Sequence, residues 1–103
     1  MLYWGDIDTR GFAILSQLRE RFAHVASMLM DRETLMAHEV HWGSEDRPSR
    51  LDLSNLTVHE RTLYDDLRDN RIRKGLRLEQ ERIGYGWVQR HLQELAIGHE
   101  VRV

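Results

Sequence analysis

The sequence predicts an α/β fold in which a short parallel sheet of about two strands is surrounded by helices. An apolar run at residues 2–7 is followed by a segment with helical periodicity at 10–22. A second apolar run at 25–30 comes soon after this segment and is too short for a helix. Strand, helix and strand at this spacing form a βαβ unit, whose strands lie parallel and are joined by a right-handed crossover.

Length and composition predict one domain over residues 1–103 and exclude several kinds of site. The absence of cysteine excludes disulfides, cysteine-ligated zinc and thiol catalysis. A net charge of −2 excludes a generally basic nucleic-acid coat, so any contact with DNA is expected from a local patch. No apolar run approaches the ~20 residues of a membrane span, and no signal-peptide pattern opens the chain. We therefore expect a cytoplasmic protein with no membrane partner.

The first helix is expected over residues 10–22, directly after the first strand. Thr9 is a residue type that caps helices, and it stands just before this segment. Charged residues occupy one side of the expected helix. The apolar residues on its other side, which predict the buried face, are Ile14, Leu15, Leu18 and Phe22.

Two further helices are expected after the second strand. Asp31 can cap a helix over about 32–42, and the only proline of the chain marks 43–55 as a loop. Thr57 and Glu60 then have the spacing of a capping box, which predicts the start of a helix over 57–69. The apolar residues expected to face inward on these two helices are Leu35, Met36, Leu63, Tyr64 and Leu67.

The last part of the chain is expected to hold a basic turn at 71–77 and a helix over about 79–96. Gly84 and Gly86 are expected to break this helix near its start. Its predicted inward residues are Ile83, Trp87, Val88, Leu92 and Leu95.

Two carboxylates mark the end of the first predicted strand. Asp6 and Asp8 flank Ile7, so in a strand they point to the same side. Ligands of open α/β sheets collect at the carboxyl ends of strands, where this pair stands. Two close carboxylates repel unless a cation or a proton lies between them, and hard oxygen ligands suit Mg²⁺, Mn²⁺ or Ca²⁺. Alternatively, one aspartate caps the helix and the other is solvated.

Phosphatases of the haloacid-dehalogenase type also place an Asp-x-Asp motif after an apolar strand. Their motif has Thr or Val two residues after the second Asp, whereas this sequence has Arg10 there. The short chain also leaves no room for the later motifs of that family. A Mg²⁺-dependent phosphohydrolase unrelated to DNA is therefore kept only as an alternative.

Three blocks of sequence carry a more specific resemblance. They lie at residues 3–15, 29–32 and 78–83, and the last reads Leu-Glu-Gln-Glu-Arg-Ile. In this order they resemble the C-terminal toprim domain of the nuclease subunit of Wadjet anti-plasmid systems, a family similar to the A subunit of type VI topoisomerases. The resemblance covers most of the chain and implies a partial toprim (Rossmann-like) fold.

The resemblance implies a DNA nuclease subunit that binds and cleaves double-stranded DNA together with condensin-like complex subunits. Asp6 and Asp8 match the toprim Asp-x-Asp, so they are the implied catalytic residues and the ligands of Mg²⁺ or Mn²⁺. The toprim glutamate strand has no counterpart, because only five residues precede Asp6. The chain is thus expected to be the C-terminal portion of a toprim domain, with its N-terminal part missing. A non-catalytic partner or remnant in a larger DNA-processing complex is the alternative.

The block at 78–83 supplies further candidates for the site. In the first turn of a helix, Glu79 and Glu81 diverge by about 200°, so only one can easily face the aspartate pair. Glu81 is the candidate further catalytic carboxylate, and Arg82 is a candidate contact for the carboxylates or for a DNA phosphate. Acidic residues that complement the helix dipole are the structural alternative.

Basic residues before this block are candidates for contacts with DNA phosphates. A solvated basic turn is the alternative. With Arg10 and Arg82, the candidate DNA-binding residues are Arg73, Lys74 and Arg77, and Arg71 belongs to the same cluster.

Two further expectations concern histidines and assembly. His38 and His41 are one residue closer than the two histidines of a zinc-protease helix, so structural or solvated histidines are expected rather than zinc ligands. The strand at 2–7 would leave an apolar edge open, which predicts a homodimer or pairing with an upstream polypeptide.

Overall fold

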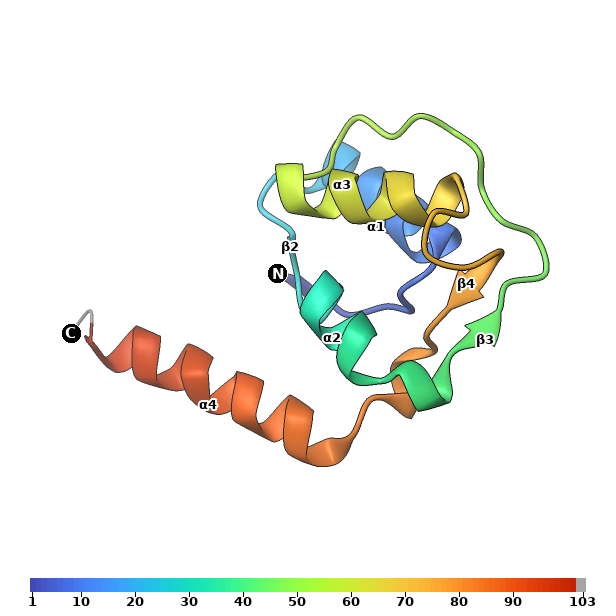
Figure 1. Ribbon diagram of the computed structural model, residues 1–103. Coiled ribbons are helices and arrows are strands. Elements are labelled where there is room, and N and C mark those ends of the chain that lie inside the picture. Colours follow the sequence, from blue (N-terminus) through green and yellow to red (C-terminus); the bar gives the residue numbers. More distant parts are fainter. Residues whose placement is uncertain (102–103) are drawn as a thin grey trace.

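The computed structural model describes the backbone of residues 1–101 and the side chains of residues 1–95 (Figure 1). It is a mixed α/β structure, as the sequence predicts. The helices are α1 (Thr9–Arg21), α2 (Arg32–Ala37), α3 (Val58–Arg68) and α4 (Tyr85–Val101), with 3-10 turns η1 (Glu39–His41) and η2 (Gln80–Arg82). The strands are β1 (Leu2–Tyr3), β2 (Ala26–Ser27), β3 (Gly43–Ser44) and β4 (Leu76–Arg77).

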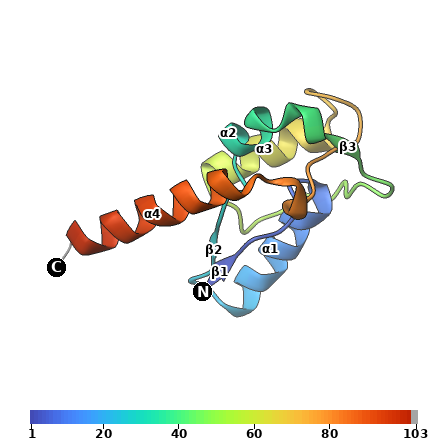
Figure 2. The same ribbon diagram turned by 90° about the horizontal axis from the view of Figure 1, so that it is seen from below.

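β1 and β2 pair in parallel, which confirms the predicted strand–helix–strand order (Figure 2). Leu2 lies opposite Ala26, and Tyr3 lies opposite Ser27. Both strands are two residues long, so the strands predicted over 2–7 and 25–30 were too long. The first strand ends early because the chain leaves β2 after Tyr3 and pairs elsewhere.

A second set of strand pairings was not predicted. Ile7 and Leu78 form an antiparallel bridge with N–H to carbonyl distances of 2.9 and 3.1 Å. β4 also pairs antiparallel with β3. The basic turn predicted over 71–77 therefore ends in a strand, because Leu76 and Leu78 alternate with Arg77 and are both buried in the core.

The core lies between α1, α3 and these strands. Leu63, Tyr64 and Leu67 of α3 are buried, as predicted. Phe12 of α1 meets Tyr64 edge-on, with ring centroids 6.3 Å apart. Thr57 and Glu60 form the predicted capping box at the start of α3.

The buried face of α1 differs from the predicted one. Phe12 and Leu15 are buried, whereas Ile14 and Phe22 are half-exposed. The helix is turned in this way because the Phe12 side of α1 packs against α3. On α2, Leu35 is buried as predicted, whereas Met36 is half-exposed and does not face inward.

The end of the chain forms a helix that leaves the body of the molecule (Figures 1 and 2). α4 begins at Tyr85, after Gly84, so the helix predicted from residue 79 starts later. Trp87 anchors its first turn by donating from Nε1 to the Thr34 hydroxyl at 3.0 Å. Farther along, Leu92 and Leu95 are half-exposed and do not face inward as predicted. No helix within the described residues is long and apolar enough to cross a membrane.

Candidate functional site

Asp6 and Asp8 are each fixed by a backbone N–H group. Asp8 is the N-cap of α1, and its Oδ1 accepts a hydrogen bond from Gly11 N at 2.6 Å. Thr9, the predicted cap, is the first residue of the helix instead. Asp6 Oδ1 accepts from Gln80 N at 2.7 Å. One oxygen of each carboxylate is therefore used to position it, and one oxygen is left over.

The two remaining oxygens face the same guanidinium group. Arg77 Nη2 lies 3.4 Å from Asp6 Oδ2, and Arg77 Nε lies 3.5 Å from Asp8 Oδ2. Arg77 reaches this position because it lies between two buried residues, Leu76 of β4 and Leu78 of the bridge with Ile7. The candidate DNA-binding arginine is thus placed between the two candidate metal ligands.

A third carboxylate, Glu45, caps the N-terminus of α1, and the sequence did not predict this contact. Glu45 is buried directly after β3 and accepts from the Thr9 hydroxyl at 2.9 Å. It also accepts from the backbone N–H groups of Thr9 and Arg10 at 3.3 and 3.1 Å. The first N–H groups of α1 are therefore satisfied by protein carboxylates. No local pattern marks Glu45, because its partners lie 35 and 36 residues away.

Burial and neighbouring charges make Asp8 a weak acid. Burial is the largest cause that raises its pKa, and Glu45 and Asp6 raise it further. The hydrogen bond from Gly11 and the charge of Arg77 oppose this, and the resulting pKa is about 6. The pKa of Tyr3 is also raised by burial and by the two aspartates. A positive group between the aspartates is therefore favourable, as the sequence predicts for a close carboxylate pair.

These residues line a cavity of about 290 Å³ at the start of α1. Its lining carries both signs of charge. Beside the aspartate pair, the charged residues that line it are Arg10, Arg47, Arg77, Glu45 and Asp46.

The block at 78–83 contacts the aspartate pair with a backbone N–H group, not with its charged side chains. Gln80 N holds Asp6, whereas Glu81 and Arg82 are exposed. The pKa of Glu81 is raised first by a hydrogen bond with Glu79 and then by the charge of that residue. Residues 80–82 form a 3-10 turn that Glu79 precedes in an extended conformation, so the first α-helical turn predicted from Glu79 is not formed.

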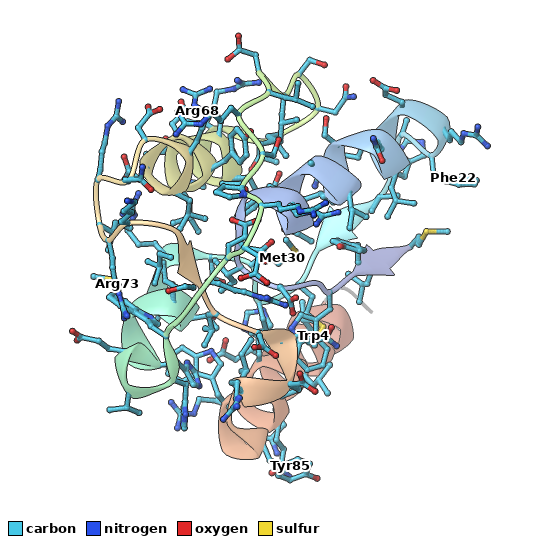
Figure 3. The ribbon with its side chains drawn as sticks, turned by 90° about the vertical axis from the view of Figure 1, so that its right-hand side faces the viewer. Trp4, Phe22, Met30, Arg68, Arg73 and Tyr85 are labelled. Atoms are coloured by element: carbon cyan, nitrogen blue, oxygen red, sulfur yellow. The ribbon has the colours of Figure 1, made fainter. Side chains whose placement is uncertain are left out.

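The basic cluster before this block is divided by the fold. Arg71 pairs with Asp66 and Asp69 at 3.0 and 3.2 Å. Arg73 and Lys74 are exposed at the turn and make no ion pair with the described residues, and Arg73 lies at the periphery in Figure 3. Only these two residues of the cluster are free to meet an external anion in the described part of the chain.

His38 is a structural residue, as expected. Its Nδ1 lies 2.7 Å from the Thr34 carbonyl oxygen, and its Nε2 accepts from Gly84 N at 3.1 Å. Both ring nitrogens are therefore used, and His38 joins α2 to the start of α4. Within the described residues, no three His, Asp or Glu side chains converge in a metal-binding arrangement.

The aspartate pair nevertheless has the donor set that a divalent cation needs. Asp6 Oδ2 and Asp8 Oδ2 are hard oxygen donors without a backbone partner, and both face one point, where the Arg77 guanidinium lies. Mg²⁺ usually takes one or two carboxylates and keeps several waters, so two ligands from this chain fit that ion.

Comparison with known protein families gives a match over most of the chain. The family described as Wadjet protein JetD, C-terminal, matches residues 1–92. No curated protein sequence matches the chain. The family match includes Asp6, Asp8, Arg77 and the block at 78–83, and it spans most of the sequence. The chain therefore belongs to the C-terminal domain family of the Wadjet protein JetD.

Proposed function

We propose that this domain is the toprim-type, metal-dependent part of a nuclease subunit that cleaves double-stranded DNA in a Wadjet anti-plasmid system. Family membership supports a role in that system, which implies a complex of several subunits. The observation that carries the proposal is the convergence of Asp6 Oδ2 and Asp8 Oδ2 on one positively charged group.

In this proposal Asp6 and Asp8 hold Mg²⁺ or Mn²⁺, and water or another polypeptide completes the coordination. A bound cation would stabilise the charge of a phosphate during strand cleavage. Arg10 lies at the cavity and is exposed, which suits a phosphate contact. Glu81 and Arg82 stay candidates at the surface beside Asp6. Condensin-like subunits are the partners that the resemblance implies.

One observation favours a second candidate function. Arg77 already balances the charge of the aspartate pair, so the pair is also suited to a purely structural role. The domain would then be a non-catalytic partner that completes a larger DNA-processing complex.

Binding of Mn²⁺ by the full chain separates the two functions. Isothermal titration should show weak binding by the wild type and none by the Asp6→Asn, Asp8→Asn double variant. Asn is as good an N-cap as Asp, and its side-chain oxygen can still accept from Gln80 N, so the double variant should fold. Glu20→Gln, Glu39→Gln removes two exposed carboxylates that do not line the cavity, and this variant should bind like the wild type. Equal binding by all three proteins would exclude the metal site.

The reaction itself is tested with supercoiled plasmid and with a small phosphate ester. We expect the complex that contains this subunit to cleave plasmid with Mg²⁺ or Mn²⁺, and to lose cleavage with the double variant. Hydrolysis of the ester without plasmid cleavage would instead indicate a phosphohydrolase unrelated to DNA.

A further inference from the structure

Arg77 occupies the point where the aspartate pair would hold a cation. We propose that Arg77 is a positioning residue that keeps Asp6 and Asp8 together when no cation is bound, and whose side chain leaves when Mg²⁺ or Mn²⁺ binds. This inference rests on the proposed function, because it requires the aspartate pair to bind metal.

The contacts of Arg77 with the pair are long. Its Nη2 donates a long hydrogen bond to Asp6 Oδ2 at 3.4 Å, and its Nε lies 3.5 Å from Asp8 Oδ2, whereas the usual N–H···O distance is 2.7–3.2 Å. Nε is buried and has no hydrogen-bond partner within the described residues. Arg77 thus balances the charge of the pair without filling the hydrogen-bonding capacity of either group.

Both free oxygens of the pair are directed to the same place. Asp6 Oδ1 and Asp8 Oδ1 are held by the backbone N–H groups of Gln80 and Gly11. A cation and the guanidinium of Arg77 would therefore compete for Oδ2 of each aspartate. They also repel each other at such a distance, so both cannot occupy the space together.

The fold lets the side chain of Arg77 move without the backbone. Leu76 and Leu78 are buried on either side of it, and Leu78 forms the bridge with Ile7. The Arg77 side chain itself is 32% exposed and lines the cavity with Arg10 and Arg47. A path from the aspartates into the cavity is therefore present, while β4 stays anchored.

Competition predicts that removal of the guanidinium strengthens metal binding. Arg77→Gln should bind Mn²⁺ about fivefold more tightly than the matched control Arg73→Gln, since the charge pair that must break is partly exposed. Arg73 is exposed and makes no ion pair within the described residues, so its variant controls for the change in net charge. In the presence of a chelator, Arg77→Gln should have a lower melting temperature than Arg73→Gln. Saturating Mn²⁺ should reduce this difference in melting temperature.

A second measurement uses the wild-type chain, in case Arg77→Gln does not fold. The Nε–H resonance of Arg77 should shift on titration with Mg²⁺, in step with the backbone amides of Asp6 and Asp8. An unchanged Nε–H resonance while those amides shift would overturn the proposal, as would equal Mn²⁺ affinity of Arg77→Gln and Arg73→Gln. In both cases the proposed function survives if the Asp6→Asn, Asp8→Asn variant has lost metal binding. Metal binding that this double variant retains would overturn both.

Discussion

Arg19 of α1 donates hydrogen bonds to both carboxylate oxygens of Glu60 of α3, with N···O distances of 2.5 and 3.1 Å. Glu60 also accepts from the Ser27 hydroxyl at 2.5 Å and from Thr57 N at 2.8 Å. One buried carboxylate therefore joins the two main helices, the capping box of α3 and strand β2. Arg19 is itself mostly buried, so neither charge is left without a partner.

The Glu60 carboxylate should make stability depend on pH. Burial alone would raise its pKa, but the hydrogen bonds from Arg19, Ser27 and Thr57 lower it to about 2, from an ordinary 4.5. Because the folded-state pKa is depressed, the stabilisation is present above pH about 4.5 and is lost as the pH falls toward 2. The loss should reach up to about 3 kcal/mol.

Urea unfolding between pH 7 and pH 2.5 measures this effect. Glu60→Gln should lower the free energy of unfolding at pH 7 by about 3 kcal/mol, because it leaves Arg19 buried without a full ion pair. It should also flatten the pH dependence below pH 5. The exposed Glu20→Gln is the control and should match the wild type. An equally steep pH dependence in Glu60→Gln would contradict the assignment.

Gly11 sets the distance between α1 and the segment that carries Asp6. A Cβ atom at this position would lie 2.1 Å from the carbonyl oxygen of Asp6. Gly11→Ala should therefore push α1 away, lower stability by about 1–3 kcal/mol and weaken Mn²⁺ binding. Gly86→Ala is the matched control, since nothing lies within 4 Å of its Cβ, and helix propensity should leave stability unchanged or raised by up to about 1 kcal/mol. Thermal melts and Mn²⁺ titration of both variants test the contact.

Arg73 and Lys74 are the exposed part of the basic cluster, so they are the residues most suited to bind a DNA backbone. The Arg73→Ala, Lys74→Ala double variant should weaken duplex binding equally for all sequences and reduce the salt slope by about 2. Arg68→Ala, Arg71→Ala removes the same charge from arginines already held by aspartates, and it should have a smaller effect. Fluorescence anisotropy at several salt concentrations measures both. Equal losses in the two double variants would assign binding to net charge alone.

The edge of β1 should determine how the chain assembles. Among the described residues β1 pairs only with β2, and Met1 and Leu2 are largely exposed beside it. We expect a homodimer through this edge at micromolar concentration, or a complex with another polypeptide that pairs with it. Leu2→Lys should weaken the assembly, whereas Val40→Lys, at an exposed position in the η1 turn, should not. Sedimentation velocity measures the assembly, and a stable wild-type monomer that pairs with no other polypeptide would count against this prediction.

Local sequence patterns determined much of the fold. The capping box of Thr57 and Glu60, the apolar spacing of α3 and the parallel order of β1 and β2 need only neighbouring residues, or a short crossover, to be recognised. The shared side of Asp6 and Asp8 follows from their alternation with Ile7, although Ile7 lies in a bridge with Leu78 and not in β1. These features rest on hydrogen bonds and side-chain periodicity within one element, or on the pairing of two strands joined by one helix.

The surroundings of that pair were decided by tertiary structure. From the sequence, Arg77 belongs to a basic turn, and only the pairing of Ile7 with Leu78, 71 residues later in the chain, brings it to the aspartates. Glu45 is likewise a loop residue in the sequence, and only the fold brings it to Thr9. The buried face of α1 likewise depends on packing of Phe12 against Tyr64, and it is not the most apolar side of the helix. Such contacts depend on which segments the whole core brings together, and short-range periodicity carries no information about partners 35 or more residues away.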